Sequence, residues 1–180
     1  MFCFEYLPRY GAFKDYDSIK AGSVLDMIQD VSSKASEDCG YGINKLREMG
    51  VAWLLQGIKV RFEENIRPDK AILIKTAVKP SGGVTSERCC YISQNDVIVG
   101  KSVANWFLFD VAKKRPIRIP QEILEVYSTG NFDDDFFNYK KLSVSKKKQW
   151  VVNSVFFLLK QKQASTLCLS IFCLNMIQTL

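Results

Sequence analysis

One amphipathic helix followed by four long strands is the feature that most constrains the fold of this chain. Apolar and small residues between Ala21 and Cys39 recur at spacings of three and four, and Gly40 marks the end of the helix. We expect Asp17 or Ser18 to cap its start. Four runs rich in β-branched and aromatic residues follow, at residues 51–62, 71–79, 84–93 and 97–109.

Shorter segments complete this pattern. We expect an opening strand at 2–6, a short helix at 43–49, an extended segment at 113–120 and a helix at 121–127. Short turns between the last three long runs predict antiparallel hairpins. A single helix can bury its apolar face in such a chain only if the sheet curls around it. We therefore predict an α+β hot-dog fold, a long central helix wrapped by a curved antiparallel sheet, with an irregular or partly helical C-terminal tail.

Charge divides the chain into two parts. Residues 1–135 hold 18 of the 25 Lys+Arg and all 19 Asp+Glu, whereas residues 136–180 hold seven Lys and no acid. The net charge of +6 therefore belongs to the tail and does not indicate a nucleic-acid partner. We predict a hot-dog domain at 1–135 and a basic tail at 136–180 that is not homologous to it.

The tail has three interpretations. Its composition of Lys, Gln, Asn, Ser, Leu and Phe without acids is what an out-of-frame reading of A/T-rich DNA produces. A frameshift, or a truncation that replaces a second domain, is therefore the favoured hypothesis. The uncharged run at 163–180 approaches the length of a membrane span, but polar residues dilute it, and a tail anchor is the weaker alternative.

The absence of histidine limits the chemistry. Ser-His-Asp and Cys-His triads and His-ligated metals are excluded for this chain alone. Neither metal-ligand spacing nor a phosphate-binding glycine loop is present, so we expect no metal and no cofactor. The six cysteines lack a CxxC pair, and the start lacks the features of a secretory signal. We therefore expect reduced thiols and a cytoplasmic protein.

Five segments, in order along the chain, resemble the N-terminal hot-dog half of bacterial acyl-acyl-carrier-protein thioesterases. The resemblance covers about residues 2–135 and depends on the segments Asp26–Asp30, Ser36–Ile43, Gly50–Leu55, Asn105–Asp110 and Lys114–Pro120.

This resemblance implies a fold, an activity and a partner. Members of the family are tandem hot dogs that hydrolyse the thioester between a fatty-acyl chain and the phosphopantetheine arm of acyl carrier protein. Their N-terminal half contributes much of the acyl tunnel, and their catalytic residues lie in the C-terminal half around an Asp-x-Asn-x-His-x-Asn-Asn motif. This sequence has no such motif, so we assign no catalytic residue and do not promote Asn153 to one.

The resemblance also suggests binding residues. Gln29 matches the tunnel-lining helix, and Trp53 and Trp106 lie on strands expected to flank it, although hydrogen bonding to a neighbouring strand and plain core packing are the simpler interpretations. The basic residues Lys113, Lys114, Arg115 and Arg118 either dock the acidic carrier protein or form a solvated loop.

The sequence is consistent with two candidate functions. The first is an acyl-acyl-carrier-protein thioesterase of fatty acid biosynthesis, a thiolester hydrolase by family, represented here by a catalytically incomplete half. The second is a non-catalytic hot-dog module that forms a homodimer and binds acyl chains or a protein partner.

Overall fold

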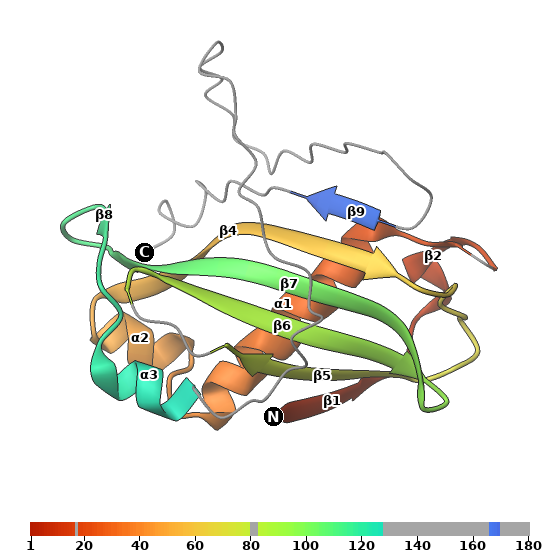
Figure 1. The fold of residues 1–180 in the computed structure, drawn as a ribbon, viewed down its shortest axis with the longest axis horizontal. Coiled ribbons are helices and arrows are strands. Elements are labelled where there is room, and N and C mark those ends of the chain that lie inside the picture. The colour runs from red at the N-terminus through yellow and green to blue at the C-terminus, as the bar shows by residue number, and fades with distance from the viewer. Residues whose placement is uncertain (17, 80–82, 128–165, 170–180) are drawn as a thin grey trace, which may run out of the picture.

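The computed structural model describes residues 1–16, 18–79, 83–127 and 166–169. One long helix, α1 (Ala21–Asp38), lies across one face of a curved antiparallel sheet (Figure 1). This arrangement confirms the predicted hot-dog fold.

The strands of the main sheet follow the order β1-β5-β6-β7-β4-β9, with β8 paired to β7. Their bounds are β1 Phe2–Tyr6, β4 Val51–Phe62, β5 Ile72–Val78, β6 Thr85–Gln94, β7 Val97–Asp110, β8 Arg115–Pro116 and β9 Thr166–Leu169. A separate small sheet pairs β2 (Phe13–Asp15) with β3 (Ser18–Ile19). The remaining helices are η1 (Tyr10–Ala12), α2 (Ile43–Glu48) and α3 (Gln121–Tyr127).

The two ends of α1 differ in how well the sequence predicted them. At the C-terminal end, Gly40 has φ +79°, its amide donates to the Glu37 carbonyl, and the amide of Tyr41 donates to the Ser36 carbonyl. These bonds form a Schellman motif, which requires a left-handed residue and confirms Gly40 as the stop. At the start, the predicted Asp17 or Ser18 cap is wrong. Ser18 belongs to β3, and the cap position is Lys20, whose side chain makes no capping hydrogen bond.

The sheet combines local and long-range connections. Asn95 and Asp96 both have positive φ, at 50° and 62°, and make the tight turn that joins β6 to β7. Positive φ at both central residues matches the twist of a two-residue hairpin. In contrast, β4 pairs with β7 and not with its successor β5, so the two strands lie on opposite sides of the β6–β7 hairpin.

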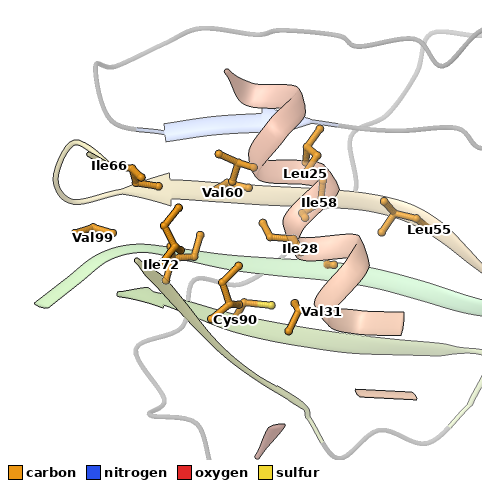
Figure 2. Close-up of a cluster of buried hydrophobic side chains, with 14 of the residues drawn as sticks. Leu25, Ile28, Val31, Leu55, Ile58, Val60, Ile66, Ile72, Cys90 and Val99 are labelled. Atoms are coloured by element: carbon orange, nitrogen blue, oxygen red, sulfur yellow. The ribbon is translucent and has the colours of Figure 1, made fainter. Parts of the chain in front are cut away.

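The core lies between α1 and the sheet. Figure 2 shows Leu25, Ile28 and Val31 of α1 directed at side chains of four strands, and Ile28 and Val31 are fully buried. Each such aliphatic side chain contributes about 1.5–3 kcal/mol when fully buried. The strand residues of this cluster that Figure 2 labels are Leu55, Ile58, Val60, Ile72, Cys90 and Val99.

Most of the tail predictions lie outside the described residues, including those on Asn153 and on most of 163–180. The described tail residues Thr166–Leu169 form β9, a strand and not the irregular or helical structure expected, antiparallel to β4 from Ile58↔Leu169 to Arg61↔Thr166. No helix in the described part of the chain has both the length and the apolar character that a membrane crossing requires.

Candidate functional site

A second apolar cluster forms at the C-terminal end of α1, where α2 and α3 pack on the sheet. Within it, Trp53 of β4 contacts Tyr127 of α3: the two rings are edge to face, with centroids 6.2 Å apart. Trp53 Nε1 and the Tyr127 hydroxyl are both buried, and neither forms a hydrogen bond of good geometry with the described residues. Burial raises the pKa of Tyr127, and its proximity to Ser36 and Trp53 lowers this pKa in part. Buried polar groups normally find a partner, so each is a position at which a ligand could bind.

The second predicted tryptophan lies beside the first. Trp106 is opposite Leu55, and Trp53 is opposite Leu108, in the β4–β7 ladder. The two indoles are therefore diagonal neighbours on the helix-facing side of the sheet. Trp106 packs against the main core, and its buried Nε1 also lacks a partner among the described residues. The structure thus brings Trp53 and Trp106 together on adjacent strands.

Gln29 is on α1 and is half-buried. Its main-chain carbonyl accepts a hydrogen bond of 3.0 Å from Ser33 Oγ. The neighbouring turn is held to β1 by Tyr6, whose hydroxyl donates to the Met27 carbonyl at 3.1 Å and to Asp30 Oδ2 at 2.8 Å. The role of Gln29 in a tunnel stays a prediction.

A cavity of about 250 Å³ opens between β1, the C-terminal end of α1, β5, β6 and α3. Gln29, Trp53 and Trp106 do not line it, but Trp53 contacts Tyr127, which does. Its lining consists of Met1, Phe2, Cys3, Ala35, Asp38, Cys39, Thr76, Ala77, Val78, Arg88 and Tyr127.

The cavity floor carries a polar group that the sequence reading did not single out. Arg88 on β6 is 6% exposed, and its Nη1 donates to Thr76 Oγ1 at 3.4 Å. Thr76 Oγ1 also accepts from Cys90 Sγ at 3.4 Å and donates to the Cys89 carbonyl at 2.9 Å. Thr76 on β5 therefore accepts from the charged side chain and donates to the backbone of the next residue on the same strand, β6.

The thiols near this floor are not activated nucleophiles. Burial raises the pKa of Cys89 to about 12, and it also raises the pKa of Cys90 and of Cys39. Because the thiolate is the reactive form, these three thiols are protonated and inert at neutral pH.

The predicted basic residues lie on the β7–β8 turn and just beyond it, and all four are exposed. Lys113 contacts Asp110 in two ways. The Asp110 carboxylate accepts a hydrogen bond of 2.8 Å from the Lys113 amide and forms an ion pair of 3.2 Å with Lys113 Nζ. The first of these bonds is the main reason why the pKa of Asp110 is lowered. Lys114, Arg115 and Arg118 form no ion pair with the described residues, which leaves three positive charges at one end of the molecule.

Arg88 and Tyr127 are the site residues that sequence reasoning missed. Arg88 stands two residues before Cys90 and four before Ile92, all on the helix-facing side of β6. A charged residue at an inward position of an apolar strand was the available signal. Nothing in the local sequence showed that Tyr127 would reach it.

A long helix held by a curled antiparallel sheet, with the free space at the helix–sheet layer, defines the hot-dog class of thioesterase folds. The chain belongs to the acyl-acyl-carrier-protein thioesterase N-terminal domain family, whose model matches residues 2–127. This match shows the family that the sequence resemblance indicated. The search of curated proteins found no match.

Solved structures show the same fold at low sequence identity. An acyl-acyl-carrier-protein thioesterase from Bacteroides thetaiotaomicron has a TM-score of 0.72 and 12% identity over 88% of this chain and 63% of its own. The 12:0-acyl-carrier-protein thioesterase from Umbellularia californica has a TM-score of 0.66 and 14% identity over 89% and 65%. This chain therefore spans less than two thirds of the length of these enzymes.

Shorter proteins share the fold over nearly their whole length. A 1,4-dihydroxy-2-naphthoyl-CoA thioesterase from Synechocystis has a TM-score of 0.63 and 11% identity over 71% of this chain and 96% of its own. The described part of this chain thus corresponds to one hot-dog unit.

Proposed function

We propose that this chain is the acyl-binding N-terminal half of an acyl-acyl-carrier-protein thioesterase, which hydrolyses fatty-acyl thioesters to free fatty acid and carrier protein. The family match over residues 2–127 carries the proposal, because it coincides with the helix and the sheet that wraps it. In this role Gln29, Trp53 and Trp106 contact the acyl chain, and Lys114, Arg115 and Arg118 face the acidic carrier protein.

We propose that the chain alone does not complete the reaction. Thioester hydrolysis needs a general base, an attacking water and donors at the carbonyl oxygen. The chain has no histidine, and burial keeps the thiols of Cys39, Cys89 and Cys90 protonated. The catalytic residues would then come from a second hot-dog unit, and the boundary at residue 135 stays part of this proposal.

Hydrolysis of dodecanoyl-acyl-carrier-protein by the purified 180-residue chain tests this incompleteness. We expect thiol release no faster than in buffer. Ordinary enzymatic turnover that disappears on substitution of a residue within this chain, for example Cys39→Ser, would show that the chain is a complete enzyme.

Binding of the same substrate tests the acyl-binding role separately. Trp106→Leu should weaken binding roughly tenfold, since a large part of an aromatic contact surface is removed. Tyr10→Leu is the matched control, because Tyr10 is 79% exposed. Equal effects of the two substitutions on calorimetric affinity would remove Trp106 from the site.

A non-catalytic homodimeric module is the second candidate. The fold match over 96% of the Synechocystis chain favours a single hot-dog unit that folds without a second one. The lack of histidine in this chain is the reason to propose that such a unit is non-catalytic. Light scattering during size exclusion discriminates between the candidates: a stable homodimer supports the module, and a monomer argues against it.

The four described cysteines are free, and we accordingly propose the cytoplasm as the compartment.

A further inference from the structure

The cavity at the end of α1 contains a buried positive charge. The Arg88 side chain carries five N–H donors and stays protonated in proteins, yet the residue is only 6% exposed. Its described contacts are one hydrogen bond of 3.4 Å to Thr76 Oγ1 and the Tyr127 ring, whose centroid is 5.6 Å from the guanidinium carbon. Most of its donors are therefore unused by these contacts.

No carboxylate among the described residues pairs with this charge. Asp38 also lines the cavity, but it is exposed and forms no ion pair with Arg88. Burial lowers the pKa of Arg88. The nearby thiols and the phenol act in the opposite direction and raise it; they belong to Cys90, Tyr127, Cys39 and Cys89. Buried charges in proteins are normally paired, because leaving water costs several kcal/mol per ion.

A second polar residue lines the same cavity. Tyr127 is 7% exposed, and its buried hydroxyl forms no hydrogen bond of good geometry with the described residues. Burial raises the pKa of this hydroxyl, and Ser36 and Trp53 lie near enough to lower it in part. Tyr127 comes from α3, whereas Arg88 comes from β6, so two elements far apart in the sequence converge on one space. Both groups can donate to the same acceptor.

The remaining walls are mixed. Phe2, Ala35 and Val78 supply apolar surface, and Thr76 and Asp38 supply polar surface. A volume of about 250 Å³ accommodates about eight non-hydrogen atoms at roughly 30 Å³ each. Hexanoate has this size, with a head group for the donors and an alkyl chain for the walls.

We propose that this cavity binds a short aliphatic carboxylate, with the carboxylate on Arg88 and Tyr127 and the alkyl chain on Phe2, Ala35 and Val78. The planar guanidinium matches a carboxylate with two parallel hydrogen bonds. Such a ligand is either a free fatty acid or the far end of a dicarboxylic acyl group. A free fatty acid is also the product of the proposed hydrolysis, so this inference deepens the proposed function by assigning the carboxylate to Arg88. The binding measurements below need no catalysis, so they can fail or succeed separately from it.

Calorimetric titration of the full 180-residue chain tests the proposal. Hexanoate should bind, whereas hexanol and inorganic phosphate should bind at least roughly tenfold more weakly, because each lacks one of the two required features. Monomethyl adipate separates the two sources: binding tighter than that of hexanoate favours a dicarboxylic acyl group, and weaker binding favours a free fatty acid. Equal binding of hexanol or of phosphate would overturn the proposal.

Two substitutions locate the site. Arg88→Met should abolish hexanoate binding without loss of the fold, since replacing an unpaired buried charge by an apolar group of similar shape is neutral or stabilising. Tyr127→Phe should weaken hexanoate binding several-fold and keep the ring contacts with Trp53. Arg47→Met, at an exposed position of α2, is the control and should bind like the wild type.

The same substitutions can refute the site. Unchanged hexanoate affinity in Tyr127→Phe, together with hexanoate binding in a folded Arg88→Met, would place the ligand elsewhere. Binding that occurs only after Asp133, Asp134 and Asp135 are replaced by Asn would mean that the chain supplies its own counter-ion. That result would also overturn the proposal.

Discussion

Thr76 Oγ1 on β5 lies 3.4 Å from Nη1 of Arg88 on β6 and accepts the hydrogen bond that joins this buried guanidinium to the neighbouring strand. The same hydroxyl donates to the Cys89 carbonyl at 2.9 Å, so one completely buried side chain satisfies two groups of β6. Removing the hydroxyl therefore leaves a buried donor and a buried acceptor without this partner.

Thr76→Val should lower the free energy of unfolding by about 1–3 kcal/mol, the cost of leaving buried polar groups unsatisfied. Thr85→Val is the matched control, because Thr85 is exposed near the start of β6 and should change stability by less than about 0.5 kcal/mol. Urea denaturation of both variants measures the difference. A loss no larger than that of the control would mean that the Thr76 hydroxyl has another role.

Ile28→Ala should be strongly destabilising, because Ile28 is 0% exposed at the centre of the contact between α1 and the sheet (Figure 2). Truncation of a buried Ile typically costs about 2–5 kcal/mol through lost burial and a residual cavity. Ile43→Ala on α2 is the control, since Ile43 is 58% exposed. Similar thermal unfolding of the two variants would contradict the packing described for α1.

The Tyr6 hydroxyl makes stability depend on alkaline pH. Burial, followed by the hydrogen bond to Asp30, raises the Tyr6 pKa above its ordinary value of 10.0. The folded state therefore keeps a proton that the unfolded chain loses. The contribution of this group is complete below pH 10 and is lost as the pH rises beyond it.

Tyr6→Phe should lose about 1 kcal/mol of stability at pH 7, because two contacts to α1 disappear, and its decline above pH 10 should be shallower than that of the wild type. Tyr10→Phe, at a 79% exposed position, is expected to follow the wild type at every pH. Denaturation midpoints between pH 7 and 11 provide the comparison, and parallel curves for Tyr6→Phe and wild type would exclude this linkage.

The exposed charges near β8 should control encounter with an acidic carrier protein. Replacing Lys114, Arg115 and Arg118 by Glu reverses three positive charges and should reduce the association rate by roughly tenfold or more at low salt, with a smaller effect at high salt. Lys14→Glu, in the small β2–β3 sheet, is the control for a charge change elsewhere. Stopped-flow association at two ionic strengths measures both, and equal rates would assign the basic residues to an ordinary solvated loop.

The sequence predicted those parts of the fold that depend on neighbouring residues. The 3.6-residue period of α1, the Gly40 stop and the β6–β7 turn were readable because each is specified within a few positions. The start of α1 was not, since Ser18 pairs with Asp15 in a two-strand ladder that competes with capping. The pairing of β4 with β7 follows from the closure of the sheet and has no local signal.

The candidate site likewise has residues that the sequence predicted and residues that it did not. Trp53 and Trp106 were predicted to flank the helix, and they are diagonal neighbours in the β4–β7 ladder. Arg88 and Tyr127 meet because α3 folds back over the sheet, and their separation in the chain hides that contact. Composition and spacing alone could not place a buried charge beside a buried phenol.

The strand pairing also has a consequence for biosynthesis. Phe2 of β1 pairs with Thr76 of β5. Strand β4 cannot pair with β7 until β7, which ends at Asp110, has been synthesised. While the chain leaves the ribosome, the apolar face of α1 therefore has no completed sheet to cover it until more than half of the sequence has been made. Such long-range closure predicts slow folding, roughly milliseconds to seconds for β-rich domains. The nascent chain should depend on chaperones during that interval, because α1 is made before the surface that buries it.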